Sequence, residues 1–230
     1  MLLGRILGAN GSSGPTPGIN TLLLNHFDGT DGATSFSDAI PGITWSFTGS
    51  NAELDTARSK FGVSSVYFSA ASTTRLNGET FISPHSGDWT IEGFVNISSG
   101  DFFRLGALDT GGAEIVIIDI AVGSDTVRMY AQDNVASPIF DNTVGVTVNV
   151  DTWYHFALCR NSGTSYEGFF NGNRLFSEST STDTDAFVKG TMLTSSITSG
   201  PQWCDEFRIR KAVQYSGATY SVPSSAFVAD

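Results

Sequence analysis

The feature that most constrains this chain is the alternation of apolar and polar residues within short segments. In DWTIEGFVNI, residues 88–97, one face of an extended chain carries Trp89, Ile91, Gly93, Val95 and Ile97, and the other carries Thr90, Glu92, Phe94 and Asn96. A period of two residues is typical of a strand with one face in the core and a more polar face opposite.

Similar segments recur along the chain and are separated by clusters of turn-forming residues. The expected strands are 22–27, 64–68, 89–97, 114–121, 126–131, 153–160, 165–171 and 203–210. Segment 114–121 is apolar on both faces, so we expect it to be covered on both sides. In FFNGNRLF, residues 169–176, Asn171, Gly172 and Asn173 predict a hairpin turn, because Asn and Gly tolerate positive φ. These patterns predict an all-β, two-sheet antiparallel sandwich.

Composition supports one domain of this class. The chain has 230 residues, of which 40% are hydrophobic and only 15% are charged, which suits one sizeable core with polar turns. The net charge is -11 and Lys and Arg do not cluster, so we expect no nucleic-acid partner. No apolar stretch approaches the ~18 residues of a membrane helix, so we expect no membrane partner either.

The first twenty residues differ in composition from the rest. Residues 9–20, ANGSSGPTPGIN, predict a flexible linker, so the chain divides into an arm, 1–20, and a domain, 21–230. Two interpretations fit the apolar patch of the arm, which consists of Leu2, Leu3, Ile6 and Leu7: a disordered terminus, or an arm that docks onto another protein.

Cys159 and Cys204 are the two cysteines of the chain, and neither lies in a zinc-binding or redox spacing. Each lies in an apolar, strand-like segment. Free buried cysteines are the preferred interpretation, and a disulfide is the alternative if the two strands are neighbours.

Five motifs in order carry a resemblance. They are LLLNHFDGTDG (22–32), SKFGVSSVYFSA (59–70), DWTIEGFVNI (88–97), DTWYHFALCRNSGTSYEGFFNGNRL (151–175) and WCDEFRIRKAVQYS (203–216). Together they resemble the laminin G-like branch of the concanavalin A-like lectin/glucanase superfamily, in the form found in virion proteins of tailed bacteriophages. The resemblance spans residues 21–228 and implies a jelly-roll sandwich of two curved antiparallel sheets.

The resemblance also implies one structural calcium ion, because family members often hold such an ion between the first and last strand regions. The matching positions are Asp28, in HFDG, and Asp205, in WCDEFRIR. Calcium takes six to eight oxygen ligands, which carboxylates and turn carbonyls supply. The alternatives are that Asp28 caps a turn and that Asp205 pairs with Arg208 or Arg210. WCDE departs from the small or aliphatic residues usual before this Asp-Glu pair.

The sequence offers no catalytic constellation. Glucanases of this superfamily use E-x-D-x-x-E, and the chain has no such triplet, so we expect Glu92 to be a solvated strand residue. No G-x-S-x-G elbow occurs, and His26 and His155 are expected to be packed or hydrogen-bonded, with His85 in an exposed loop. We therefore expect no enzymatic activity.

The resemblance and the arm together lead to the first functional hypothesis. It is a structural protein of a bacteriophage virion, either capsid decoration or a tail or fibre appendage, which displays a lectin-like domain and contacts other virion proteins through residues 1–20. Host-surface glycans are the second expected partner, with Trp45, Trp203, Tyr130 and Tyr220 as the aromatic residues to inspect, although each is more often a core residue. The alternative is a stand-alone, extracellular or cell-surface carbohydrate-binding module, and a hydrolase or lyase ranks lowest. The sequence leaves the glycan, the oligomeric state and the position on a particle open.

Overall fold

A computed structural model describes residues 20–37, 44–48, 52–69, 75–78, 87–98, 102–108, 114–133, 137–162, 164–180, 182, 191–194 and 201–230. These residues form strands and turns without a helix, so the predicted all-β class is confirmed. The described part of the chain accordingly offers no helix long and apolar enough to span a bilayer.

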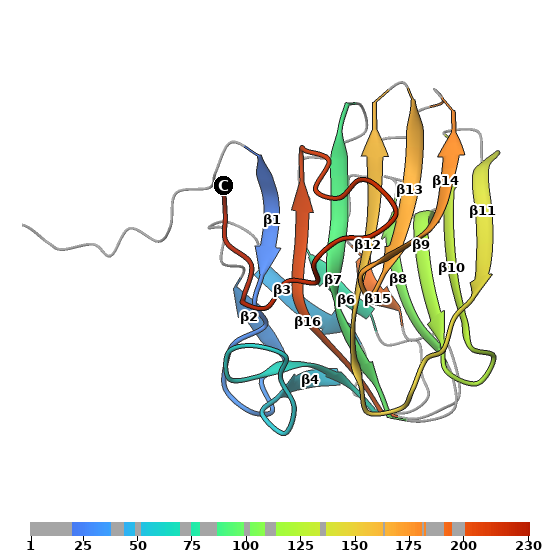
Figure 1. The fold of residues 1–230 in the computed structure, drawn as a ribbon. Coiled ribbons are helices and arrows are strands. Elements are labelled where there is room, and N and C mark those ends of the chain that lie inside the picture. The colour runs from blue at the N-terminus through green and yellow to red at the C-terminus, as the bar shows by residue number, and fades with distance from the viewer. Residues whose placement is uncertain are drawn as a thin grey trace, which may run out of the picture.

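An eight-stranded antiparallel sheet forms one layer of the sandwich (Figure 1). Its order is β14-β13-β12-β7-β16-β5-β4, and β1 pairs with β16 beside β5. The bounds are Thr21–Asn25 for β1, Ala52–Asp55 for β4, Ser65–Phe68 for β5, Trp89–Ile97 for β7, Trp153–Asn161 for β12, Ser165–Phe170 for β13, Asn173–Ser179 for β14 and Gln202–Arg210 for β16.

Two four-stranded sheets face this layer. One has the order β11-β10-β9-β8, with β8 at Phe102–Leu108, β9 at Glu114–Ala121, β10 at Thr126–Gln132 and β11 at Pro138–Gly145. The other has the order β15-β6-β3-β2, with β2 at Ser35–Ser37, β3 at Thr44–Thr48, β6 at Arg75–Gly78 and β15 at Thr191–Thr194. The second layer is therefore split, where the sequence analysis expected one sheet.

The main core lies between the layers, and strand alternation explains its composition. From β7 it takes Trp89, Ile91, Val95 and Ile97, and from β12 it takes Tyr154, Phe156 and Leu158, all at most 6% exposed. For β7, this is the apolar face that the alternation in the sequence indicated. Residues 115–120 of β9 are also buried on both faces, as predicted.

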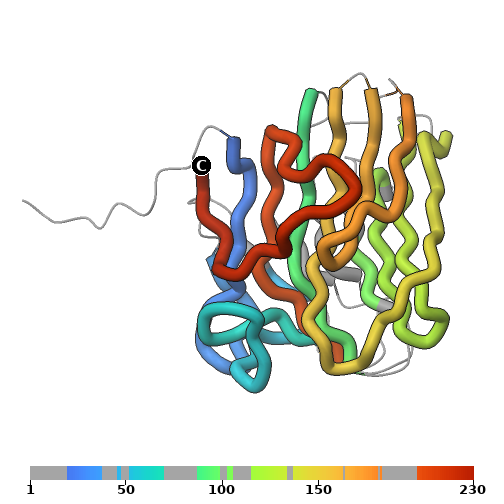
Figure 2. The backbone as a smooth tube through the Cα atoms, in the orientation of Figure 1, coloured from blue at the N-terminus to red at the C-terminus, as the bar shows by residue number. Residues whose placement is uncertain are grey.

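The outer face of the eight-stranded sheet is covered as well, which corrects one expectation. The C-terminal segment, residues 211–230, runs across this face in front of β16, β7 and β12 (Figure 2). Glu92 was expected to be solvated, and that expectation is wrong, because this segment and Arg208 leave it 0% exposed.

A β-bulge in β16 changes which residues face the core. The register to β7 shifts between Asp205 and Arg208, and Glu206 has a φ of 51°, unusual for a residue other than glycine. Cys204 and Phe207 both lie in the main core although three positions separate them. The extra residue reverses the alternation, so Asp205 and Arg208 reach the outer side of the sheet.

The cysteine and hairpin predictions are both confirmed. Cys159 and Cys204 are free and buried, in clusters on opposite faces of the sheet with β7 between their strands. Asn171 and Gly172 have φ values of 43° and 90°, the positive values that a two-residue hairpin turn requires.

The first and last described residues lie side by side. The N–H groups of Asn20 and Thr21 donate to the carbonyl of Asp230, at 2.9 and 3.1 Å. The first described strand, β1, begins at Thr21. Residues 1–19, and with them the proposed docking patch, lie outside the described residues, as does His85.

Candidate functional site

Asp28, the first predicted cation ligand, anchors the loop of residues 56–64. Its Oδ1 atom accepts the N–H groups of Val63 at 2.6 Å and Ser64 at 3.3 Å. Gly62 allows this approach, because it has a φ of 64° and a Cβ placed there would lie 2.2 Å from Asp28 Oδ1. Asp28 therefore caps a turn, although through the amides of a distant loop rather than through its own.

Asp205, the second predicted ligand, binds the same loop from the β16 bulge. Its Oδ2 accepts the N–H groups of Lys60 at 2.6 Å and Phe61 at 3.1 Å, and its Oδ1 accepts the N–H of Glu206 at 2.9 Å. Burial raises the pKa of Asp205 to about 8, although these amide donors favour its charged form.

His26 lies next to these carboxylates. Its Nδ1 atom is 2.9 Å from both carboxylate oxygens of Glu206, whose side chain is 1% exposed. The hydrogen bond to Glu206 raises the pKa of His26 despite its partial burial. The expectation that His26 is hydrogen-bonded is confirmed. His26 belongs to the junction between β1 and β16.

The junction fits a loop anchor better than a calcium shell in its present arrangement. Backbone N–H groups point at both oxygens of Asp205 and at one oxygen of Asp28, and a cation needs those lone pairs free. Among the described residues, no group of three His, Cys, Asp or Glu side chains is placed to hold a metal. Calcium at Asp28 and Asp205 stays a prediction.

Replacing Asp28 with alanine tests this prediction. The two loop amides lose their acceptor, so we expect the free energy of unfolding to fall by about 1–2 kcal/mol. Denaturant unfolding in EDTA and in millimolar calcium separates the roles. If Asp28 is a calcium ligand, the loss of unfolding free energy is larger in calcium than in EDTA, because bound metal stabilises only the folded wild type. Equal losses in the two buffers leave Asp28 with the role of a loop anchor only.

A buried polar network joins the outer face of the sheet to the C-terminal segment. Glu92 Oε1 accepts Nε and Nη2 of Arg208 at 2.8 and 2.6 Å. Glu92 Oε2 accepts the hydroxyl of Tyr215 at 2.7 Å and lies 3.3 Å from His155 Nε2. Nδ1 of His155 lies 2.5 Å from the hydroxyl of Tyr220. Because the carboxylate can only accept, His155 carries its proton on Nε2 and accepts from Tyr220 at Nδ1.

Two titratable groups of this network, His155 and Glu92, lose stabilisation in acid. Burial lowers the pKa of His155, whereas Glu92 has its pKa lowered because hydrogen bonding from His155 and the charge of Arg208 outweigh the opposing effect of burial. A lowered folded-state pKa gives stability that is present above the unfolded value and lost as pH falls. For His155 the loss begins below the ordinary value of 6.5, and for Glu92 below 4.5.

Replacing His155 with glutamine is expected to flatten the pH dependence of stability between about pH 6.5 and 5. Glutamine keeps an N–H donor for Glu92 but does not titrate. Urea unfolding at half-unit pH steps gives the free energy of unfolding of the wild type and of the variant. The difference between the two values cancels the opposite contribution of His26, because both proteins contain it. Parallel curves would contradict the lowered pKa of His155, because they would mean that His155 binds its proton equally well in the folded and the unfolded chain.

The aromatic residues singled out in the sequence are mostly packed. Trp203 is 6% exposed, donates its indole N–H to Asp55 at 2.8 Å, and lies under the guanidinium of Arg58. Tyr220 packs on the buried network, and half-buried Tyr130 donates to Gln132. The side chain of Trp45 lies outside the described residues.

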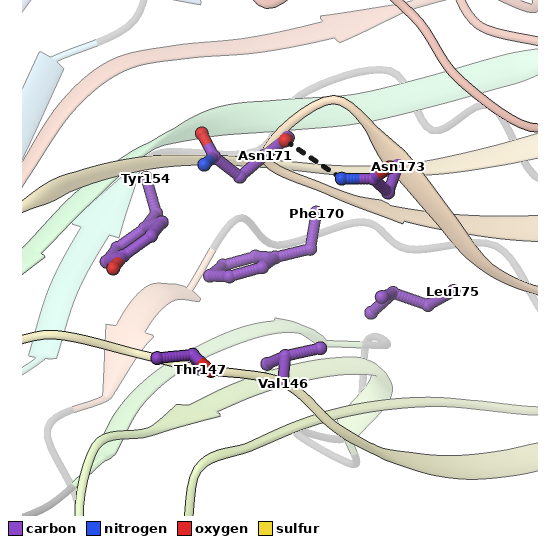
Figure 3. Close-up of a pocket in the computed structure, with 7 residues that line it drawn as sticks. All are labelled: Val146, Thr147, Tyr154, Phe170, Asn171, Asn173 and Leu175. Carbon is purple, nitrogen blue, oxygen red and sulfur yellow. Dashed lines mark hydrogen bonds between the residues drawn. The ribbon is translucent and has the colours of Figure 1, made fainter.

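A pocket opens at the end of the β13–β14 hairpin, where it meets the connection after β11 (Figure 3). Its volume is about 330 Å³, and its lining residues are Val146, Thr147, Tyr154, Phe170, Asn171, Asn173 and Leu175. This lies at the small end of the ~300–1,000 Å³ range of ligand pockets in proteins.

The pocket has an aromatic floor and a polar rim. The rings of Tyr154 and Phe170 stack with centroids 5.0 Å apart and are at most 6% exposed. Thr147, Asn171 and Asn173 are exposed at the rim. In Figure 3, Val146 and Thr147 lie across from the two rings, with Leu175 at one end.

Local geometry fixes the rim. The N–H of Asn171 donates to the carbonyl of His155 at 2.8 Å, which ties the hairpin turn to β12. Nδ2 of Asn173 donates weakly to the carbonyl of Asn171, at 3.4 Å. The sequence analysis assigned Asn171 and Asn173 to a turn; this holds for Asn171, whereas Asn173 is the first residue of β14. Their joint role as a pocket was missed, and the only sequence signal was a pair of amide side chains directly after FF.

Comparisons with known proteins show the fold of the chain. No protein-family model and no curated protein matches the sequence. The structure is similar to the botulinum neurotoxin type G receptor-binding domain, with a TM-score of 0.62 at 11% identity over 85% of this chain and 49% of that one. It is also similar to the binding domain of paraclostridial mosquitocidal protein 1, with a TM-score of 0.59 at 10% identity over 85% of this chain and 50% of that one.

These values define a class. The chain is an all-β antiparallel sandwich with the jelly-roll-like architecture of those toxin domains, and it spans about half the length of the chains it matches. At this identity the likeness is one of fold and does not extend to ligands. The narrower resemblance to laminin G-like domains stays a prediction from the sequence motifs.

Proposed function

We propose that this chain is a non-catalytic recognition domain that binds carbohydrate on a host surface. The observation that carries the proposal is the pocket of the β13–β14 hairpin, in which an aromatic floor meets exposed amide and hydroxyl side chains. Aromatic rings offer an apolar face to the C–H groups of a sugar, and amide side chains bond its hydroxyl groups. The structural neighbours are named as receptor-binding or binding domains, which supports a recognition role.

Two features support a domain without catalysis. The seven residues that line the pocket include no Asp, Glu, His or Cys, the side chains that most often serve as general acid, general base or nucleophile. Glu92, the carboxylate nearest to the glucanase pattern, is fully buried and bonded to Arg208 and Tyr215. A polysaccharide-cleaving activity that Glu92→Gln abolishes would overturn this part of the proposal.

A panel of immobilised glycans tests the recognition role directly. We expect specific binding of the full chain to a defined set of sugars, with the weak, millimolar-range affinity typical of one small pocket. Silence across bacterial and eukaryotic glycans would overturn the proposal and leave a structural appendage.

We propose further that the domain is displayed on the virion of a tailed bacteriophage, where residues 1–20 contact other virion proteins. The five ordered motifs of the laminin G-like resemblance support this placement, as does the apolar patch in the first seven residues. A stand-alone carbohydrate-binding module at the cell surface is the alternative, and the same pocket serves both.

Immunogold labelling of purified particles, with antibody against residues 21–230, decides between the two. Label on the capsid indicates decoration, and label at the tail indicates adhesion. Absence from particles removes the virion placement and favours the free module. Deleting residues 1–20 is expected to abolish incorporation, and unchanged incorporation would remove the anchoring role of the arm.

A further inference from the structure

The pocket of the β13–β14 hairpin has the chemistry to select among sugars. Its seven lining residues carry no charge, in a chain whose net charge is -11. An anionic sugar would find no Lys or Arg in the pocket and would approach a negative protein, so the site favours a neutral ligand.

Four of the seven lining residues make up the apolar part of the pocket. Tyr154, Phe170, Val146 and Leu175 form its floor and sides, and only the rim is polar. A sugar that carries hydroxyl groups alone would leave some of them against these side chains, and burying an unpaired hydroxyl is unfavourable. The floor therefore suits a ligand with a methyl-sized apolar substituent.

The rim matches an amide group. Among the described residues, the Asn171 side chain has no protein partner, and Tyr154 accepts two bonds from Asn149, at 2.9 and 3.2 Å, without an acceptor for its own proton. A primary amide supplies both a donor and an acceptor. An acetamido group presents one N–H, one C=O and one methyl group, which corresponds to the rim and the floor together.

We propose that this pocket binds one N-acetylated hexosamine unit, with the acetamido methyl against Tyr154 and Phe170 and the acetamido polar atoms on Asn171 and Asn173. This inference rests on the proposed recognition function and names its ligand class. The volume of about 330 Å³ suits a single sugar unit with its substituent rather than a long chain.

The variants are chosen so that they keep the fold. Asn171→Asp retains a residue that tolerates the φ of 43° but adds a negative charge at the rim. Val146→Phe fills the pocket from the half-buried side facing the rings. The matched control is Asn161→Asp, the same change at an exposed residue at the far end of β12.

Titration of the full chain with N-acetylglucosamine and with glucose, followed by NMR or calorimetry, tests the inference. We expect N-acetylglucosamine to bind at least tenfold more tightly than glucose. Asn171→Asp and Val146→Phe should each reduce this binding at least tenfold, and Asn161→Asp should leave it unchanged, with melting temperatures confirming that all variants fold.

The outcomes separate this inference from the proposed function. Equal binding of glucose, tighter binding of glucuronate, or unchanged binding in both pocket variants would overturn the acetamido pocket while glycan recognition stands. If the wild type binds no sugar in the titration or on the glycan panel, both proposals fall.

Discussion

Replacing Arg208 with methionine is expected to lower the free energy of unfolding by about 3–5 kcal/mol, the cost of breaking a buried ion pair from one side. Glu92 is 0% exposed and Arg208 is 6% exposed, so water cannot replace the lost guanidinium. The remaining hydrogen bonds, from Tyr215 and His155, both reach the other carboxylate oxygen. Denaturant unfolding at pH 7 measures the change.

Two controls identify the cause of this loss. Arg128→Met breaks a comparable pair with Asp141, at 2.7 and 2.8 Å, in the sheet of β8 to β11, where the Arg128 side chain is 32% exposed. Arg128 also lies 3.5 Å from Asp119, which keeps its two hydrogen bonds from Arg104. Its loss should be at most about 1 kcal/mol, as for other exposed pairs. The double variant Glu92→Gln/Arg208→Met should regain part of the stability, because it removes the buried charge. A loss under 1 kcal/mol in Arg208→Met would show that water reaches Glu92.

The Arg208 variant should also loosen the C-terminal segment. Nη1 of Arg208 donates to the carbonyl of Val228 at 3.0 Å, and its guanidinium lies 4.4 Å from the ring centre of Phe227. Phe227 also donates its N–H to Glu206. Faster amide exchange confined to residues 211–230 would show that the network holds this segment in place.

The second large effect is expected from Gly62→Ala. Two costs combine, because the residue has a φ of 64° and its new Cβ would lie 2.2 Å from Asp28 Oδ1. The left-handed conformation costs about 1–2 kcal/mol, and displacing Asp28 from the loop amides costs about 1–2 kcal/mol more. We expect a total of about 2–4 kcal/mol in denaturant unfolding.

Gly217→Ala is the matched control for the backbone cost. Gly217 has a φ of 85°, and an added Cβ would meet nothing within 4 Å. The Gly217→Ala variant should therefore lose about 1 kcal/mol of unfolding free energy. In the double variant Asp28→Ala/Gly62→Ala the clash is absent, so the two losses should not add. If Gly62→Ala and Gly217→Ala lose the same unfolding free energy, Asp28 moves aside freely and does not hold the loop.

Local patterns in the sequence were sufficient for eight of the sixteen strands in the described residues, for the core face of β7 and for the hairpin. Trp89, Ile91 and Val95 face the core because alternate side chains of a strand lie on one side of a sheet, whatever the neighbouring strands are. Asn171 and Gly172 turn the chain because their own backbone preferences allow positive φ. Each of these properties depends on residues that are close together in the sequence.

The candidate site depends on residues that only the tertiary structure brings together. The pocket combines residues 146–147 with the β13–β14 hairpin, and the sequence pattern does not specify which loop meets that hairpin. Asp28 and Asp205 were singled out from the sequence, but their shared loop lies between them in the chain and its amides carry no side-chain signal.

The burial of Glu92 likewise depends on residues that are distant in the sequence. Its alternation places it on the second face of β7, and that part of the prediction is correct. Whether this face meets water depends on residues 211–230, which have no strand periodicity, and on the bulge that turns Arg208 outward. In a regular strand such as β7, local geometry sets which residues share a face, so the alternation in the sequence was enough to assign them. What covers each face depends on contacts between distant segments, which arise only in the folded chain.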